Sequence, residues 1–66
     1  MIVYTKPGCP YCAALKRDLM ERDVPFEEID VFAVPGAADR VEELTGRRVV
    51  PVIVDGDVVK AAPEGG

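Results

Sequence analysis

The sequence contains no histidine and only two cysteines, and these absences limit its chemistry. A zinc ion in a protein takes about four cysteine, histidine or carboxylate ligands. One copy of this chain would therefore need carboxylates, or a second chain, to complete a zinc site around its two thiols. Two cysteines are also too few for the several disulfides that stabilise many small secreted domains.

A long apolar segment is also lacking. Residues 1–4 are apolar, but Lys6, Pro7 and Gly8 end this segment well short of the apolar core of an export signal, which needs about 7–15 residues. No run approaches the roughly 20 apolar residues of a membrane-spanning helix. We therefore expect no membrane partner and a cytoplasmic location, where cysteines tend to be catalytic, redox-sensing or metal-binding.

Positive charge is in the minority, because 12 acidic residues face 8 basic ones and the net charge is −4. This balance argues against a nucleic-acid partner. Residues 1–22 differ from the rest, with four basic and two acidic side chains. Solvated helix faces explain most of this unevenness, and the alternative is a positive rim that favours an anionic thiolate or substrate.

Six segments carry the patterns of regular structure. Strands contain β-branched residues between turn signals, whereas helices repeat apolar residues every three or four positions. The first helix is expected to begin at Pro10 and to end before Pro25, and Gly46 is expected to cap the second. The predicted strands are residues 2–4, 26–31, 49–54 and 57–60, the second helix is residues 35–45, and Asp55-Gly56 joins the last two strands.

The order β-α-β-α-β-β predicts an α/β fold with a four-stranded mixed sheet and two helices. A β-α-β start forms a parallel, right-handed unit, and the closing hairpin adds two antiparallel strands. A chain of 66 residues has room for one domain, which we place at residues 1–60, with residues 61–66 as a flexible C-terminal tail.

The two cysteines, Cys9 and Cys12, lie three residues apart at the predicted start of the first helix. A bridge between them would close almost no loop, so the pair is better explained by chemistry than by stabilisation. Free backbone N–H groups at a helix start favour negative charge, and such a position lowers a thiol pKa from about 8.5 to roughly 3.5–7.5. Pro10 is expected to hold Cys9 exposed, while Cys12, one turn further on, is more buried and protonated.

This arrangement predicts thiol–disulfide exchange in two steps. Cys9 attacks a substrate disulfide, and Cys12 then attacks the Cys9 sulfur and leaves a Cys9–Cys12 bridge. A Cys-x-x-Cys pair beside a β-α-β pattern is typical of thioredoxin-like redox proteins.

The stretch Lys6-Pro7-Gly8-Cys9-Pro10-Tyr11-Cys12 resembles the active site of a dithiol glutaredoxin. A second stretch, Thr45-Gly46-Arg47 followed by Val49-Val50-Pro51, resembles the segment in which that family carries a cis-proline. The chain is thus similar to a short glutaredoxin-like redoxin with a thioredoxin-like fold, over residues 1–60.

The resemblance implies further site residues. A cis bond before Pro51 would present the backbone of Val50 to a substrate cysteine, and Cys9 and Cys12 would be the catalytic pair. Glutathione would be the co-substrate, and no bound cofactor or metal is expected. The residues expected to border the glutathione groove are Lys6, Tyr11, Arg47 and Arg48, with the basic ones near its carboxylate.

One departure from the family lies at the end. Glutaredoxins usually follow the last strand with a Gly-Gly-acidic segment that begins a third helix and binds the γ-glutamyl end of glutathione. Residues 60–66 read Lys-Ala-Ala-Pro-Glu-Gly-Gly, so we expect the usual C-terminal third helix and this clamp to be lacking.

Three functions remain open. The first is reduction of protein disulfides or glutathione mixed disulfides by a monomer. The second keeps this chemistry in a redoxin recharged by a thioredoxin-reductase-type enzyme, for example as a donor to ribonucleotide reductase. The third is an iron–sulfur cluster shared by two chains, which a brown, dimeric protein would indicate; the stiff Pro10 makes it less favourable.

Overall fold

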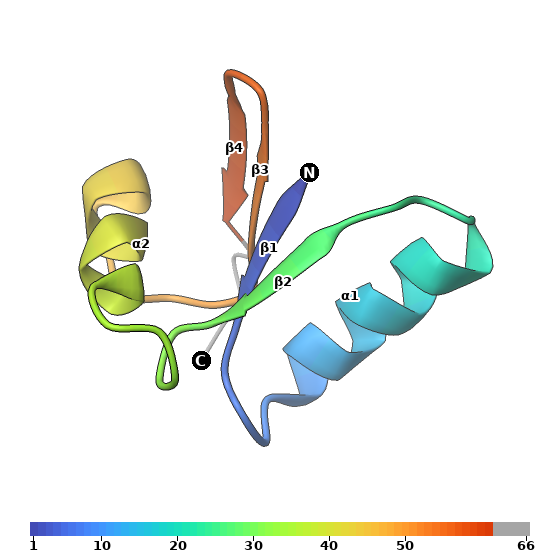
Figure 1. Ribbon diagram of the computed structural model, residues 1–66, viewed down its shortest axis with the longest axis horizontal. Coiled ribbons are helices and arrows are strands. Elements are labelled where there is room, and N and C mark those ends of the chain that lie inside the picture. Colours follow the sequence, from blue (N-terminus) through green and yellow to red (C-terminus); the bar gives the residue numbers. More distant parts are fainter. Residues whose placement is uncertain (62–66) are drawn as a thin grey trace.

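The computed structural model of the protein describes residues 1–61 and confirms the order β-α-β-α-β-β (Figure 1). The strands form one sheet in the order β2-β1-β3-β4. Strands β1 and β2 are parallel, whereas β3 is antiparallel to both β1 and β4. The elements are β1 (Ile2–Thr5), α1 (Pro10–Glu21), β2 (Glu27–Asp30), α2 (Ala37–Thr45), β3 (Val52–Asp55) and β4 (Val58–Ala61).

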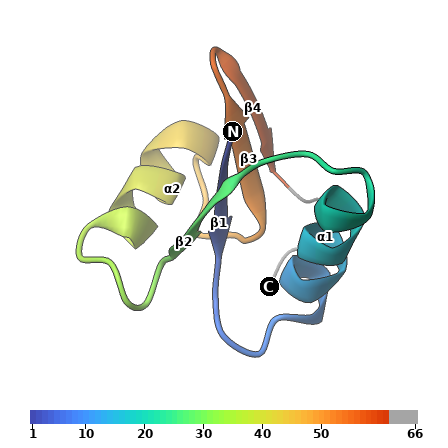
Figure 2. The same cartoon turned by 45° about the vertical axis from the view of Figure 1, so that its right-hand side comes forward.

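The two helices lie on opposite sides of the sheet (Figures 1 and 2). On one face the strand register aligns Tyr4 with Ile29 and Val52, and these side chains pack in the cluster that contains Ala37 and Val41 of α2. Successive strand residues point to opposite faces, so Val3 lies on the face toward α1. The central strand β1 is therefore buried on both sides.

Helix α1 begins at Pro10, as predicted, but it ends at Glu21 rather than next to Pro25. Asp23 adopts a left-handed conformation (φ 56°), and its N–H donates to the carbonyl oxygen of Met20. The N–H of Val24 donates to the carbonyl oxygen of Leu19, which completes a Schellman motif. The helix thus stops at a left-handed cap two residues before the proline.

Helix α2 begins at Ala37, two residues after the predicted start at Pro35. Gly36 immediately before it has a φ of 81°, which is incompatible with the right-handed helix and sets the later start. The other end agrees with the prediction, because Gly46 is the left-handed cap (φ 80°).

The strand ends differ from prediction for local reasons. Strand β3 starts at Val52 instead of Val49, because Pro51 has no N–H for the sheet. The hairpin loop is Gly56-Asp57, one residue later than predicted, and Gly56 takes the positive φ (60°) that the turn requires. Strand β2 is limited to Glu27–Asp30, shorter than predicted by one residue at each end.

The C-terminal boundary needs one correction. Ala61, which we predicted to begin the flexible tail, pairs with Val52 as the last residue of β4. The rest of the predicted tail, residues 62–66, and the prediction about a third helix lie outside the described residues. In residues 1–61, no helix is both long and apolar enough to cross a membrane.

Candidate active site

Cys9 lies immediately before the first residue of α1, in the helix N-cap position. Its backbone is extended (φ −87°, ψ 113°), and its Sγ accepts a hydrogen bond from the N–H of Cys12 at 3.4 Å. Pro10, which has no N–H to satisfy, follows as the first helical residue. The predicted position of the thiol at a helix start is therefore confirmed.

The prediction that Cys9 is exposed is wrong for the residue as a whole, because only 6% of its surface is accessible. Cys9 belongs to a buried cluster together with Tyr4, Cys12 and Val50, and packing in this cluster removes it from solvent. Both cysteines nevertheless border an open cavity of about 440 Å³, which gives a substrate a route to the sulfur.

Both thiols are free, and their surroundings shift their pKa values in opposite directions. Burial alone raises the pKa of Cys9, but hydrogen bonds from Cys12 and from the Tyr11 N–H, with the Lys6 charge, outweigh it and lower this pKa. Burial and the hydrogen bond to Cys9 raise the pKa of Cys12 to about 11. At neutral pH, Cys9 is thus the better nucleophile and Cys12 holds its proton.

Alkylation by iodoacetamide should report this difference. Because only the thiolate reacts, the lowered pKa of Cys9 predicts a half-maximal rate at a lower pH than that of an ordinary cysteine thiol. A Cys12→Ser protein isolates Cys9 for the rate measurement and keeps a hydroxyl donor beside it. A Cys9→Ser protein isolates Cys12, whose half-maximal rate should lie at a higher pH than that of Cys9, because burial still raises the pKa of Cys12 in this variant. A half-maximal rate for Cys9 at pH 8.5 or above would contradict the assignment.

The cavity beside the cysteines also contains an ion pair that the sequence analysis missed. Lys16 Nζ lies 2.9 Å from Glu28 Oε2, and the buried Thr5 hydroxyl donates to the same oxygen at 2.8 Å. These contacts raise the pKa of Lys16 and lower that of Glu28. The i, i+4 spacing of Cys12 and Lys16 on one helix could have predicted that Lys16 lies beside the cysteine site. No sequence pattern predicted that Glu28 lies there, because its position next to Lys16 depends on how β2 pairs with β1.

The bond between Val50 and Pro51 is cis, as predicted. Val50 is buried in the same cluster as Cys9, although 41 positions separate the two in the printed sequence. Within residues 1–61, neither the N–H nor the C=O of Val50 makes a backbone hydrogen bond. The fold thus brings to the cysteine site two backbone groups that no backbone partner in the described part of the chain occupies.

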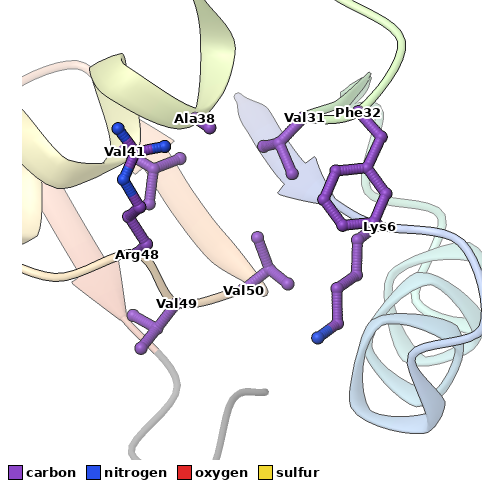
Figure 3. A pocket seen from close by; sticks show the side chains of 8 residues that line it. All are labelled: Lys6, Val31, Phe32, Ala38, Val41, Arg48, Val49 and Val50. Atoms are coloured by element: carbon purple, nitrogen blue, oxygen red, sulfur yellow. The ribbon is translucent and has the colours of Figure 1, made fainter.

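Next to Val50 lies a groove of about 180 Å³, which we call the Val50 groove (Figure 3). Two basic residues border it. Its apolar side chains come from the loop between β2 and α2, from α2 itself, and from the segment before β3. The lining residues are Lys6, Val31, Phe32, Ala38, Val41, Arg48, Val49 and Val50. Lys6 borders both this groove and the cavity of the two cysteines, so it connects the two.

The remaining predicted site residues are not gathered in one place. Arg48 lines the Val50 groove, but its guanidinium binds Asp39 Oδ1 at 2.5 Å and Glu42 Oε2 at 2.9 Å. Arg47 is exposed in the loop after α2 and lines neither the Val50 groove, nor the cavity of the two cysteines, nor the cavity beside Tyr11. Tyr11 borders a separate cavity of about 290 Å³ that Pro51 also lines.

In the described part of the chain, no three residues with cysteine or carboxylate side chains lie together as metal ligands would. The sheet order, the two helices on opposite faces and the Cys9–Cys12 pair at the start of α1 define a thioredoxin-like fold.

Comparison with known proteins gives the family. The family model described as glutaredoxin matches residues 1–59. A glutaredoxin of Neisseria meningitidis serogroup B is 45% identical over 56 residues, which cover 83% of this chain and 66% of the relative. The glutaredoxin-like protein NrdH of Salmonella typhimurium is 39% identical over 56 residues, covering 85% of this chain and 68% of the relative. The chain belongs to the glutaredoxin family.

A solved structure described as "Metal Binding of Glutaredoxins" is also similar. It is 44% identical in sequence with a TM-score of 0.58, and the match covers 86% of this chain and 62% of that one. The matched part thus spans about two thirds of the length of these relatives. Family membership supports redox chemistry of the thiol–disulfide kind in general terms.

Proposed function

We propose that the chain is a thiol–disulfide oxidoreductase that reduces protein disulfides or glutathione mixed disulfides with Cys9 as nucleophile and Cys12 as resolving thiol. The observation that supports this most is the opposite shift of the two pKa values at one helix start. An exchange enzyme needs one thiol ionised for attack and a second that waits until the mixed disulfide has formed.

The proposed reaction has two steps. The Cys9 thiolate attacks one sulfur of the substrate disulfide, a Cys9–substrate disulfide forms, and the other substrate sulfur leaves as a thiolate that takes up a proton. Cys12 then loses its proton and attacks the Cys9 sulfur, which expels the second substrate thiolate. The substrate gains two electrons and two protons, and the protein is left with a Cys9–Cys12 disulfide.

The site residues have distinct proposed roles. Val50 would pair with the backbone of the substrate cysteine through its N–H and C=O, which make no backbone hydrogen bond within residues 1–61, beside the cis Pro51. Lys6 stabilises the Cys9 thiolate through its charge. Once Cys9 is consumed in the mixed disulfide, its hydrogen bond no longer holds the Cys12 proton, so the pKa of Cys12 falls and the second step can proceed.

For recharging, we propose glutathione or a thioredoxin-reductase-type enzyme as the electron source. The names of the relatives support both, because glutaredoxins and NrdH-type glutaredoxin-like proteins match over the same part of the chain. Lys6 and Arg48 at the Val50 groove would attract the carboxylate of glutathione, although Arg48 would have to leave Asp39 and Glu42. We propose a monomer that acts in the cytoplasm, where thiols are kept reduced.

Two coupled assays test this function. Both follow the oxidation of NADPH in the presence of a disulfide substrate. The first assay contains glutathione and glutathione reductase, and the second contains thioredoxin reductase instead. We expect turnover with at least one system and none in the absence of the protein. The system that supports it identifies the electron source, and no turnover with either would refute the proposed function.

A further inference from the structure

The Val50 groove is built to hold an apolar group of limited size. At about 180 Å³ it is smaller than the roughly 300–1,000 Å³ of sites for drug-sized molecules. An apolar cavity of about 150 Å³ is known to bind benzene. The groove therefore matches one aromatic or branched aliphatic side chain. Figure 3 shows Phe32 and Lys6 along one side and Val49 and Val50 along another.

Phe32 is the most exposed large apolar side chain in residues 1–61, with 74% of its surface accessible. Its backbone is nevertheless fixed, because its N–H donates to Asp30 Oδ1 at 2.8 Å. The N–H groups of Ala33 and Val34 both donate to the carbonyl oxygen of Asp30, at 3.1 and 3.0 Å. An ordered turn thus presents an apolar ring to solvent at the edge of the groove, where a bound apolar group would cover it.

The charges of the groove and the size of the residue next to the substrate cysteine together favour a protein disulfide over glutathione as the ligand. Arg48 is already neutralised by Asp39 and Glu42, which leaves Lys6 as the basic lining residue that makes no ion pair within residues 1–61. The residue after cysteine in glutathione is glycine, which has no side chain to fill an apolar groove. A protein disulfide, in contrast, can place an apolar residue next to its cysteine.

Two of the residues that line the groove also belong to the surroundings of Cys9. Val50 lines it and packs in the same buried cluster as Cys9. Lys6 lines it as well and acts through its charge on the Cys9 thiolate. A substrate cysteine seated at Val50 would therefore place its neighbouring residue at the groove.

From this geometry we propose that the Val50 groove is a specificity subsite for protein disulfides in which an aromatic or branched aliphatic residue adjoins the attacked cysteine. The inference rests on the proposed function, which supplies the attack by Cys9. It adds that the protein selects these substrates over disulfides whose cysteine has only glycine beside it, and that Phe32 and Ala38 set the selectivity.

The test uses symmetric disulfides of short synthetic peptides, so that either sulfur gives the same product. The peptides carry glycine, alanine, leucine or phenylalanine next to the cysteine, on its N-terminal side in one series and on its C-terminal side in the other. The reduced full-length protein is mixed with excess peptide, quenched with acid at set times, and the released peptide thiol is measured. No external reductant is needed, so the electron source does not enter the result.

We expect the phenylalanine and leucine peptides of one series to react roughly tenfold faster than the glycine peptide, as one apolar group in a pocket permits. Phe32→Ala removes one wall and Ala38→Leu fills the groove, and each should bring the ratio close to one. Met20→Ala is the matched control, because Met20 is an exposed apolar residue (65% accessible) outside the three cavities, and it should keep the wild-type ratio.

The outcomes separate the two proposals. Equal release from all peptides would overturn the subsite and leave the proposed function standing. A preference that survives in both groove variants would also overturn it, because the preference would then arise elsewhere. No release from any peptide would refute the proposed function itself, and the subsite with it.

Discussion

Cys9→Ser is expected to lower kcat/KM for disulfide reduction by at least about 1,000-fold, because it removes the nucleophile. A serine hydroxyl is not ionised at neutral pH, and Cys12 is a poor substitute. Burial raises the pKa of Cys12 and still does so in this variant, so only a small fraction of its thiol is ionised at pH 7. The coupled assay that gives turnover for the wild-type protein measures this loss.

Cys12→Ser is the matched control for this variant. It leaves Cys9 in place, so the first step should still occur, but the mixed disulfide can no longer be resolved by the protein. Mass spectrometry should therefore show substrate attached to Cys9 after mixing with a protein disulfide. If the Cys9→Ser protein kept more than about a hundredth of the wild-type activity while Cys12→Ser trapped no substrate, the roles of the two thiols would be wrongly assigned.

Val52→Ala should cost about 2 kcal/mol of the free energy of unfolding, because Val52 has no accessible surface and packs between β1 and α2. A domain of this size has only about 3–10 kcal/mol in total, so the loss is large. The midpoint of thermal unfolding should fall by roughly 8–16 °C. Urea unfolding, followed by circular dichroism, measures the change.

The hairpin offers a control with the same substitution. Val58 is also a strand valine, but 52% of its surface is accessible, so Val58→Ala should change the unfolding free energy by no more than about 0.5 kcal/mol. Similar losses in the two variants would mean that the core does not lie between β1, β3 and α2 as described.

The fold could be predicted largely from local patterns. The β-branched segments, the helix start at Pro10 and the cap at Gly46 each depend on a few neighbouring residues, and the structure confirms them. The ends of elements were less predictable. The left-handed cap at Asp23 is an example, since aspartate adopts this conformation only when the surrounding hydrogen bonds favour it.

In the candidate site, too, some residues could be predicted from the sequence and others could not. Cys9, Cys12 and Pro51 could be found from spacing and family resemblance, because their signals lie within short stretches of the chain. The sequence alone could not decide the roles of the arginines. Only the structure shows that Arg48 is bound to Asp39 and Glu42 and that Arg47 does not line the three cavities described above.

By itself, the sequence determined the order of the elements and the chemistry of the cysteine pair, because both depend on residues only a few positions apart. The tertiary structure decided what surrounds the sulfur. Burial of Cys9, the ion pair of Lys16 with Glu28 and the apolar groove beside Val50 all join residues from different strands and helices. Such contacts depend on strand pairing and on the packing of helices against the sheet, which no short stretch of sequence specifies.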